Sequence, residues 1–360
     1  MHPEAAASMT APRIVPLPSP EYDPAKRRFQ GIPSVACSPG GRLWAAWYGG
    51  PTPAEDQNNY VIVATSADGG ATWHEVLAID PDGPGPLRAY DPEVWLAPDG
   101  RLWLFWAQQV TKEPATAHLW AMSTGEGDRP LPAWTPPRLL MRGVMMCKPV
   151  RFSWGEWCLP VSAWHQERDS ATCVVSQDGG RSWALRGACD VPRQVRSFDE
   201  HMIVEKKDGS LWMWVRTRCG IGESFSHDRG RSWSALAPSP VRHTSSRFFI
   251  GRLSSGNLLL VKNGPIDQDV GRSQLTAFIS TDDGRTWSAG LLLDARSKVS
   301  YPDAAWSCDG TIYIVHDCDR TGAQEIVVTR LSEEQILAGV KGSACFMQRV
   351  VNAPAAPARR

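Results

Sequence analysis

The stretch Ser66-Ala-Asp-Gly-Gly-Ala-Thr-Trp73 follows the pattern S-x-D-x-G-x-[ST]-W, and this pattern decides the fold because the chain repeats it. In each copy the Asp carboxylate can accept N–H groups of its own turn, the Gly adopts a positive φ, and the Trp packs sideways. We therefore expect one structural unit to recur, with the Asp residues capping turns and taking no part in catalysis. The other copies are Ser176-Gln-Asp-Gly-Gly-Arg-Ser-Trp183, Ser226-His-Asp-Arg-Gly-Arg-Ser-Trp233 and Ser280-Thr-Asp-Asp-Gly-Arg-Thr-Trp287.

The spacing of the copies indicates the blades of a β-propeller. The copies begin at residues 66, 176, 226 and 280, so the first interval is about twice the other two. A decayed copy is expected halfway along it, and Ser123-Thr-Gly125 followed by Trp134 fits that place. Repeats of about 50 residues, built from short strands such as Leu43–Tyr48, are typical of propeller blades.

We predict an all-β fold: a six-bladed β-propeller of four-stranded antiparallel blades with one short C-terminal helix. The helix is expected over 331–339, because Ser332 and Gln335 form a capping box and Gly339 suits a C-cap. Residues 1–27 are expected to be an N-terminal extension, 28–351 a single propeller domain, and the Ala/Pro-rich stretch 352–360 a disordered tail. A strand near 344–351, or residues 13–17, is expected to close the ring. The expected blades are 28–82, 85–141, 143–192, 197–240, 244–294 and 299–330.

Composition limits the partners. The chain has 38 basic and 38 acidic residues, which argues against nucleic acid or an anionic membrane surface as the main partner. Its nine scattered cysteines form no C-x-x-C pair, so reduced thiols are expected rather than disulfides or a zinc site. No metal-binding or phosphate-binding motif is present, so no metal or other cofactor is expected. The N-terminal residues lack the features of a signal peptide, and no apolar stretch is long enough to span a membrane, so we expect a cytoplasmic protein.

The repeated turn resembles the Asp-box of sialidase-type propellers, and over residues 28–330 the chain is similar to the sialidase superfamily. That resemblance implies hydrolysis of terminal sialic acids with retention of configuration. It further implies a tyrosine nucleophile, a glutamate that activates it, an aspartate acid/base, and three arginines that hold the carboxylate of the sugar.

The second half of the family pattern matches this chain. Phe198-Asp-Glu200-His201 and Val215-Arg216-Thr217 fit the segments of the activating glutamate and the second arginine, on neighbouring strands of one hairpin. Arg272 stands where the third arginine is expected, and Val299-Ser-Tyr301-Pro-Asp303 resembles the nucleophile segment. The resemblance therefore implies that Tyr301 and Glu200 are catalytic and that Arg216 and Arg272 bind substrate.

The chemistry of a sialic acid explains this set of residue types. Its carboxylate is attached to the anomeric carbon and would repel a carboxylate nucleophile, whereas a phenol avoids that repulsion. A phenol with a pKa near 10 is a poor nucleophile until a base such as Glu200 takes its proton. Arginine suits a planar carboxylate because its guanidinium group binds it through two parallel hydrogen bonds.

The first half of the chain departs from the family pattern. Where the first arginine is expected the chain reads Phe29-Gln-Gly-Ile-Pro33, so Gln30 or Gly31 takes its place, and Arg28 would need a one-residue shift to fill it. The acid/base falls in the loop Pro53–Tyr60. Asp56 is the leading candidate there, with Glu55 and Asn59 as alternatives.

A second departure lies in the last blade. The glutamate that steadies the first arginine in the family corresponds to Asp317, a shorter carboxylate. The first arginine and its supporting carboxylate have therefore changed together, which points to a remodelled carboxylate pocket. Further residues expected at the pocket end of the blades are Arg88, Asp91, Asp317 and His201 as substrate contacts, with Lys148, His165 and His316 as additional candidates.

Three functions fit these residues. The leading one is an exo-glycosidase of the sialidase type that hydrolyses a terminal acidic sugar and takes an oligosaccharide as its small-molecule substrate. The second is a propeller enzyme with other chemistry, such as a uronate-directed lyase or a rhamnosidase-like hydrolase. The third is a non-catalytic glycan-binding propeller. The sequence leaves the sugar, the linkage and the oligomeric state open.

Overall fold

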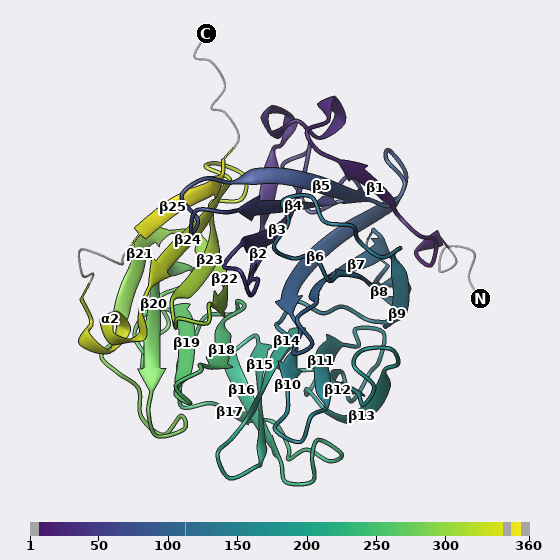
Figure 1. The fold of residues 1–360 in the computed structure, drawn as a ribbon. Helices are drawn as coiled ribbons and strands as arrows, with labels where there is room; N and C mark the ends of the chain where they lie inside the picture. The colour runs from purple at the N-terminus through teal and green to yellow at the C-terminus, as the bar shows by residue number, and fades with distance from the viewer. Residues whose placement is uncertain (1–6, 112, 341–346, 354–360) are drawn as a thin grey trace.

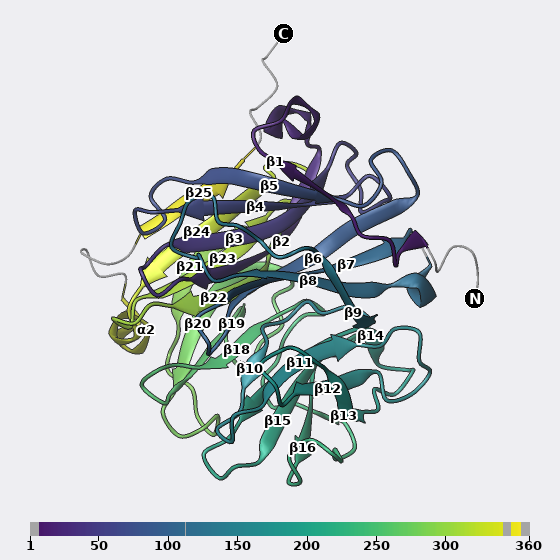
Figure 2. The same ribbon diagram turned by 45° about the vertical axis from the view of Figure 1, so that its right-hand side comes forward.

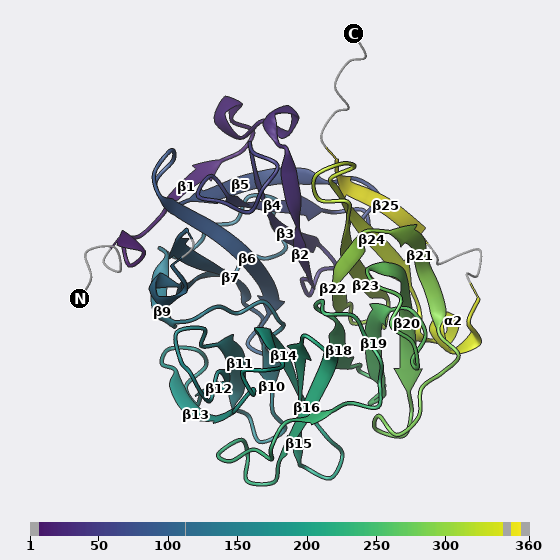
Figure 3. The ribbon, with the colours of Figure 1, turned by 180° about the vertical axis from the view of Figure 1, so that it is seen from behind.

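The computed structural model describes residues 7–111, 113–340 and 347–353, which form six antiparallel sheets arranged as a ring (Figure 1). The predicted six-bladed propeller of four-stranded blades is confirmed. In each four-stranded blade the first of the four strands along the chain lies innermost, and Figure 3 shows the ring from behind. Apart from the sheets there are one α-helix and three 3-10 turns among the described residues, η1 (Pro20–Tyr22), η2 (Pro24–Lys26) and η3 (Pro114–Thr116).

The strands follow the chain blade by blade. The first three blades are β2 (Phe29–Cys37), β3 (Leu43–Gly50), β4 (Tyr60–Ser66) and β5 (His74–Asp80); β6 (Leu87–Leu96), β7 (Leu102–Val110), β8 (His118–Thr124) and β9 (Arg138–Arg142); and β10 (Val150–Arg151), β11 (Trp157–Ser162), β12 (Ala171–Ser176) and β13 (Ala184–Cys189). The other three are β14 (Arg196–Glu205), β15 (Leu211–Thr217), β16 (Gly220–Ser226) and β17 (Ala237–Pro238); β18 (Phe249–Arg252), β19 (Leu258–Asn263), β20 (Ser273–Ser280) and β21 (Leu291–Ser297); and β22 (Val299–Trp306), β23 (Ile312–Cys318), β24 (Glu325–Leu331) and β25 (Met347–Asn352).

The two segments expected to close the ring become outer strands of separate blades. β25 is the fourth strand of the last blade, and β1 (Arg13–Pro16) adds a fifth strand to the first blade by pairing with β5 (Figure 2). The inner strands β2 and β22 pack directly against each other, and the Gln30 side chain is one of the links between the first and last blades. Its amide nitrogen donates to the Gln324 carbonyl and to the Asn352 side chain, the latter at 2.9 Å. The predicted tail lies outside the described residues from 354 onward.

The predicted C-terminal helix is present as α2 (Glu333–Ala338). Ser332 and Gln335 form the expected capping box, and Gly339 ends the helix with φ of 65°, in the left-handed conformation that glycine adopts at no steric cost. The helix lies against β20 and β21 on the outside of the fifth blade (Figure 1). It is therefore remote from the central axis.

The four repeated turns have the local geometry that their residues predict. In the third copy, Asp228 accepts hydrogen bonds from the Ser226 hydroxyl (2.8 Å), the Arg231 and Ser232 N–H groups (3.0 and 2.9 Å) and the Ser232 hydroxyl (2.6 Å). The Trp233 indole donates to the Gly230 carbonyl at 3.1 Å. The Asp residues are thus turn caps on the outer loops, as expected, and their carboxylates accept hydrogen bonds from residues of their own turn.

The cap geometry predicts a selective loss of stability. Asp228→Ala removes four hydrogen bonds to one turn, whereas Asp99→Ala in the β6–β7 turn removes a single one, from the Arg101 N–H group at 3.1 Å. We expect Asp228→Ala to lower the melting temperature by several degrees more than Asp99→Ala, measured by differential scanning calorimetry. Equal melting temperatures for the two variants would contradict this role of the repeated Asp.

Candidate active site

Four of the six innermost strands carry a β-bulge, and these bulges shape one end of the central axis. The strand register shifts at this point in β2, β6, β14 and β22. Each bulge holds a non-glycine residue at positive φ, a conformation that costs about 1–3 kcal/mol and that persists where the surrounding structure enforces it. These residues are Ile32 (φ 59°), Asp91 (48°), Asp199 (53°) and Tyr301 (54°).

The bulge in β22 places Tyr301 against residues of the fourth blade. Its phenol donates a hydrogen bond to Glu200 Oε1 at 2.7 Å. Arg216 Nη1 lies 2.6 Å from the same carboxylate oxygen and 2.6 Å from the Tyr301 oxygen. All three side chains are buried, and the second oxygen of Glu200, Oε2, has no hydrogen-bond partner among the described residues. The structure therefore brings together three of the residues that the sequence singled out.

Positive charge surrounds the Tyr301 ring. The guanidinium carbons of Arg320, Arg247, Arg272 and Arg216 lie 4.3, 5.2, 5.4 and 6.0 Å from its centroid. Burial raises the pKa of Tyr301 and the Glu200 carboxylate raises it further, while the neighbouring arginines oppose that rise. The phenol therefore keeps its proton at neutral pH until a base accepts it, and Glu200 is in contact to do so.

Arg272 reaches the same region from the fifth blade. Within the described residues its guanidinium group makes no ion pair. A cavity of about 490 Å³ is lined by Arg272 together with Arg320 and Lys298. This arrangement leaves Arg272 available for an anionic ligand, and its role in substrate binding stays a prediction.

The loop predicted to supply the acid/base separates its two carboxylates. Asp56 accepts hydrogen bonds from the Thr52 hydroxyl at 2.6 Å and from the Asn58 N–H group at 2.9 Å, so it caps its own loop. Glu55 instead extends to Arg320, with 3.3 Å between Oε1 and Nη1. The structure thus places Glu55, the alternative to Asp56, at the arginine cluster, and it does not bring Asp56 there.

Asp91 and Arg88 occupy the second blade beside this cluster. Burial raises the pKa of Asp91 to about 8, and the Glu55 charge adds to the rise while Arg88 opposes it. Arg88 is half-buried with its guanidinium carbon 3.8 Å from the centroid of the Tyr90 ring, and its Nε has no partner among the described residues. A carboxyl group that keeps its proton near neutral pH can donate it to a departing oxygen.

Asp317 supports an arginine that sequence reasoning missed. Asp317 Oδ2 accepts hydrogen bonds from Arg320 Nε at 2.8 Å and from the Ile32 N–H group at 2.9 Å, and Oδ1 accepts from the Ser300 hydroxyl at 2.7 Å. In the structure Asp317 therefore positions Arg320, and a direct contact of Asp317 with substrate stays a prediction. The only sequence feature that could have indicated this ion pair is the three-residue spacing of Asp317 and Arg320.

The three histidine candidates do not join the cluster. His201 is buried, and its ring nitrogens lie at the backbone carbonyls of Asp199 (2.9 Å) and Thr172 (2.8 Å), so neither nitrogen is directed at the cluster. Alternation along β14 explains this, because neighbours in a strand point to opposite faces. His316 pairs with Asp294 at 3.1 Å between two blades, and burial near the Arg142 charge lowers the pKa of His165.

The candidates for the first arginine are also used elsewhere. Gln30 joins the first and last blades, and Arg28 is exposed. Gly31 lies beside the Arg320 side chain: a β-carbon built on Gly31 would stand 2.8 Å from Arg320 Cδ. The first blade therefore contributes no arginine to the cluster.

A family model described as a BNR repeat-like domain matches residues 41–314. The chain belongs to the BNR repeat-like domain family. The resemblance to Asp-box propellers of the sialidase superfamily is thereby confirmed. A sialidase from Micromonospora viridifaciens is 23% identical over 339 residues, a match covering 79% of this chain and 49% of that protein. This BNR repeat-like chain thus spans about half the length of the curated relative that it matches.

Solved structures share the fold of this BNR repeat-like domain. The Hadza microbial sialidase Hz136 is similar with a TM-score of 0.65 at 18% identity, over 86% of this chain and 66% of that one. The intramolecular trans-sialidase from Ruminococcus gnavus, solved with oseltamivir carboxylate, has a TM-score of 0.68 at 14% identity, over 91% and 99%. An α-L-arabinofuranosidase from Fusarium graminearum has a TM-score of 0.63 at 12% identity, over 92% and 99%. At these identities the likeness establishes the fold alone.

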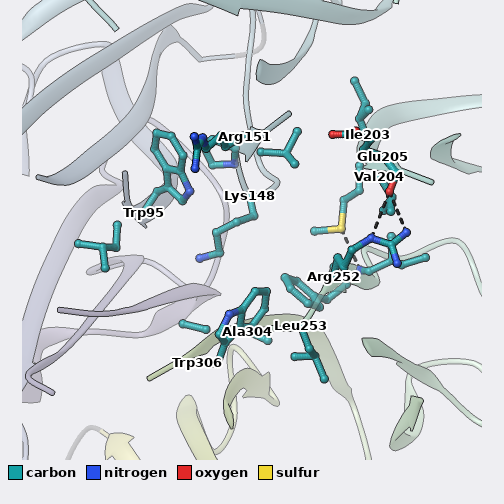
Figure 4. A pocket seen from close by; sticks show the side chains of 18 of the residues that line it. Trp95, Lys148, Arg151, Ile203, Val204, Glu205, Arg252, Leu253, Ala304 and Trp306 are labelled. Atoms are coloured by element: carbon teal, nitrogen blue, oxygen red, sulfur yellow. Dashed lines mark hydrogen bonds between the residues drawn. The ribbon is translucent and has the colours of Figure 1, made fainter. Parts of the chain in front are cut away.

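The BNR repeat-like domain has another cavity at the opposite end of its axis. It measures about 960 Å³, and Figure 4 shows Trp95 and Arg252 on opposite sides of it. Lys148 lines this cavity and bridges the buried carboxylates Glu93 (2.7 Å) and Asp303 (2.6 Å). Lys148 is therefore committed to ion pairs inside the ring and does not reach the arginine cluster.

Two features are absent from the described part of this BNR repeat-like domain. It contains no cluster of three or more His, Cys, Asp or Glu side chains with the geometry to hold a metal ion. It also contains no helix long and apolar enough to cross a membrane. The arrangement around Tyr301 supports acid–base and nucleophilic chemistry by side chains.

The raised pKa of Asp91 predicts a pH-dependent stability difference. The pKa of an unfolded Asp is about 4, and that of folded Asp91 is about 8, so the stability that Asp91 contributes is lost as pH rises between these values. Asp91→Asn stays neutral throughout. We expect the melting temperature of Asp91→Asn relative to the wild type to increase from pH 5 to pH 8 and then to level off, as measured by calorimetry. A difference independent of pH would contradict the proton assignment.

Proposed function

We propose that this chain is a retaining exo-glycosidase that removes a terminal acidic sugar, with sialic acid as the leading substrate. The observation that carries the proposal is the contact of Tyr301 with Glu200 and Arg216, at 2.6–2.7 Å, inside a ring of guanidinium groups. The distant sialidase relative supports it, because that protein matches 79% of this chain. The arginines favour an anionic sugar over a neutral one.

The first step forms a bond between the Tyr301 oxygen and the anomeric carbon. As Tyr301 attacks, its proton passes to Glu200 Oε1, which already accepts its hydrogen bond. Arg216 donates to both oxygens, so it stabilises the Glu200 carboxylate before the transfer and the negative charge that the Tyr301 oxygen gains as its proton leaves. Burial makes the free phenolate costly, so this local transfer replaces a separately ionised tyrosine.

The departing oxygen needs a proton, and Asp91 fits this role. Its pKa of about 8 keeps it protonated near neutral pH, and it lies on the bulge of β6, facing the same end of the axis. In the second step water attacks the anomeric carbon, gives one proton to Asp91, and the Tyr301 oxygen recovers its proton from Glu200. Both carboxyl groups thus return to their starting states.

Loss of the nucleophile and of the base gives the direct test of this function. We expect Tyr301→Phe and Glu200→Gln each to lower kcat on a fluorogenic sialoside by on the order of 10²–10⁴-fold, with an unchanged melting temperature. Tyr313→Phe is the matched control, because Tyr313 lies on β23 of the same blade and pairs with Ala305 toward the other end of the axis. Wild-type turnover by Tyr301→Phe would contradict the mechanism.

The assignment of the proton donor has its own test. A general acid matters most when the leaving group is poor, because a good one departs without a proton. We expect Asp91→Asn to lower kcat/KM on a disaccharide by at least about 10²-fold. We expect kcat/KM on an activated aryl glycoside, which reports the first step alone, to stay nearly unchanged. Glu55→Gln and Asp56→Asn are the comparison variants. If Glu55→Gln or Asp56→Asn showed this dependence on the leaving group and Asp91→Asn did not, the residue changed in that variant, and not Asp91, would be the proton donor.

A further inference from the structure

Arg320 fills the space that the small residue Gly31 leaves open. The Cγ and Cδ atoms of Arg320 would each stand 2.8 Å from a β-carbon at Gly31, closer than real β-carbons approach other atoms. Gly31 belongs to β2 of the first blade and Arg320 follows β23 of the last blade, and these blades are neighbours in the ring. Any larger residue at position 31 would therefore displace the Arg320 side chain.

The Arg320 side chain is held from one side only. Its Nε donates to Asp317 at 2.8 Å, and Asp317 is fixed in turn by the Ile32 N–H group. Its Nη1 and Nη2 make only long contacts of 3.3 Å, to Glu55 and Ser300. A guanidinium group offers five donors in one plane, and these contacts leave N–H groups on both terminal nitrogens of Arg320 for a ligand carboxylate.

Arg320 lies close both to Tyr301 and to Arg272. Its guanidinium carbon lies 4.3 Å from the centroid of the Tyr301 ring, nearer than that of Arg272 or Arg216. Arg320 also lines the 490 Å³ cavity together with Arg272. A carboxylate attached next to the reacting carbon would thus meet Arg320 while that carbon faces Tyr301.

We propose that Arg320, supplied by the last blade, is a substrate-binding residue that holds the carboxylate of the sugar in place of an arginine from the first blade. Gly31 provides the room for it and Asp317 orients it. The inference rests on the proposed function only in requiring an acidic sugar as ligand. It applies equally to a sialic acid and to a uronic acid, because both present a carboxylate to the same guanidinium group.

Glu55 supports this role because its carboxylate occupies the place at Arg320 that the ligand would take. The contact is 3.3 Å long and the Glu55 side chain is 43% exposed, so an incoming carboxylate can displace it. The loop carboxylate and the substrate therefore compete for one arginine. Removal of the Glu55 charge is expected to tighten the binding of an acidic sugar, and only when Arg320 is present.

Binding measurements separate Arg320 from the catalytic step. Isothermal titration with N-acetylneuraminic acid, glucuronic acid and neutral methyl galactoside is performed on Tyr301→Phe, which is expected not to turn over any of them. In this background we expect Arg320→Ala to weaken binding of the acidic sugar by about 10- to 100-fold, the value of a charged hydrogen-bond pair. Lys298→Ala, which changes another cation of the same cavity, is expected to change binding less than about 3-fold, because exposed charges contribute little.

Relocation of the arginine provides the sharpest variant. Gly31→Arg combined with Arg320→Gly moves the guanidinium group to the first blade, and we expect it to recover acidic-sugar binding that Arg320→Gly alone loses. Glu55→Gln is expected to strengthen binding in the wild type and to have no effect beside Arg320→Ala. If Arg320→Ala fails to fold, Arg320→Lys keeps the charge and loses the paired hydrogen bonds, and it is expected to weaken binding by about 10-fold.

Each result bears on Arg320 separately from the function. Unchanged binding of acidic sugars by Arg320→Ala or Arg320→Lys would overturn the inference, and so would equal binding of acidic and neutral sugars by the parent protein. Arg320-dependent binding of glucuronic acid without any sialoside hydrolysis would uphold it while the proposed sialidase activity fails. Sialoside hydrolysis that is lost in Tyr301→Phe but unchanged in Arg320→Ala would support the proposed function and overturn the inference about Arg320.

Discussion

A single carboxylate oxygen, Glu200 Oε1, accepts hydrogen bonds from Tyr301 of the last blade and from Arg216 of its own blade. Tyr301 and Glu200 are 101 residues apart in sequence, so this contact exists only in the closed ring. Closure in turn depends on the packing of the first and last blades, where Gln30 joins them through buried hydrogen bonds. The chemistry at Tyr301 is therefore coupled to the integrity of the whole propeller.

The strained residues at the bulges also contribute to the contact between Tyr301 and Glu200. A residue at positive φ turns its side chain out of the normal alternation of a strand, and four blades do this at one end of the axis. At Tyr301 the result is a phenol directed at a residue of another blade. The cost of about 1–3 kcal/mol for each such residue is offset by the buried packing of the inner strands. Strain and site thus occur at the same positions.

Much of the architecture could be predicted from short local patterns. The repeated turn needs only residues within one turn, so its caps, the blade number and the capping box of α2 follow from the sequence. Tyr301, Glu200 and Arg216 were found because each stands in a short recognisable segment on an innermost or neighbouring strand. Their mutual distances required the ring.

The remaining residues depend on distances and directions that the sequence does not encode locally. Arg320 was missed because the space for its side chain is left by Gly31, a residue near the other end of the chain. Asp56 and Glu55 differ only in the direction that one loop gives to neighbouring side chains. His201 was misplaced because the alternation of β14, read together with its backbone contacts, sends it between blades.

The most direct measurement asks which atom becomes bonded to the sugar. A sialosyl fluoride with a second fluorine beside the anomeric carbon slows both chemical steps, and its good leaving group lets the first step proceed. After incubation, intact-protein mass spectrometry is expected to show one added sugar per chain, and peptide mapping to place it on Tyr301. A bond to Asp91, Glu55 or another carboxylate, or turnover of the probe by a Tyr301→Phe variant, would contradict a tyrosine nucleophile.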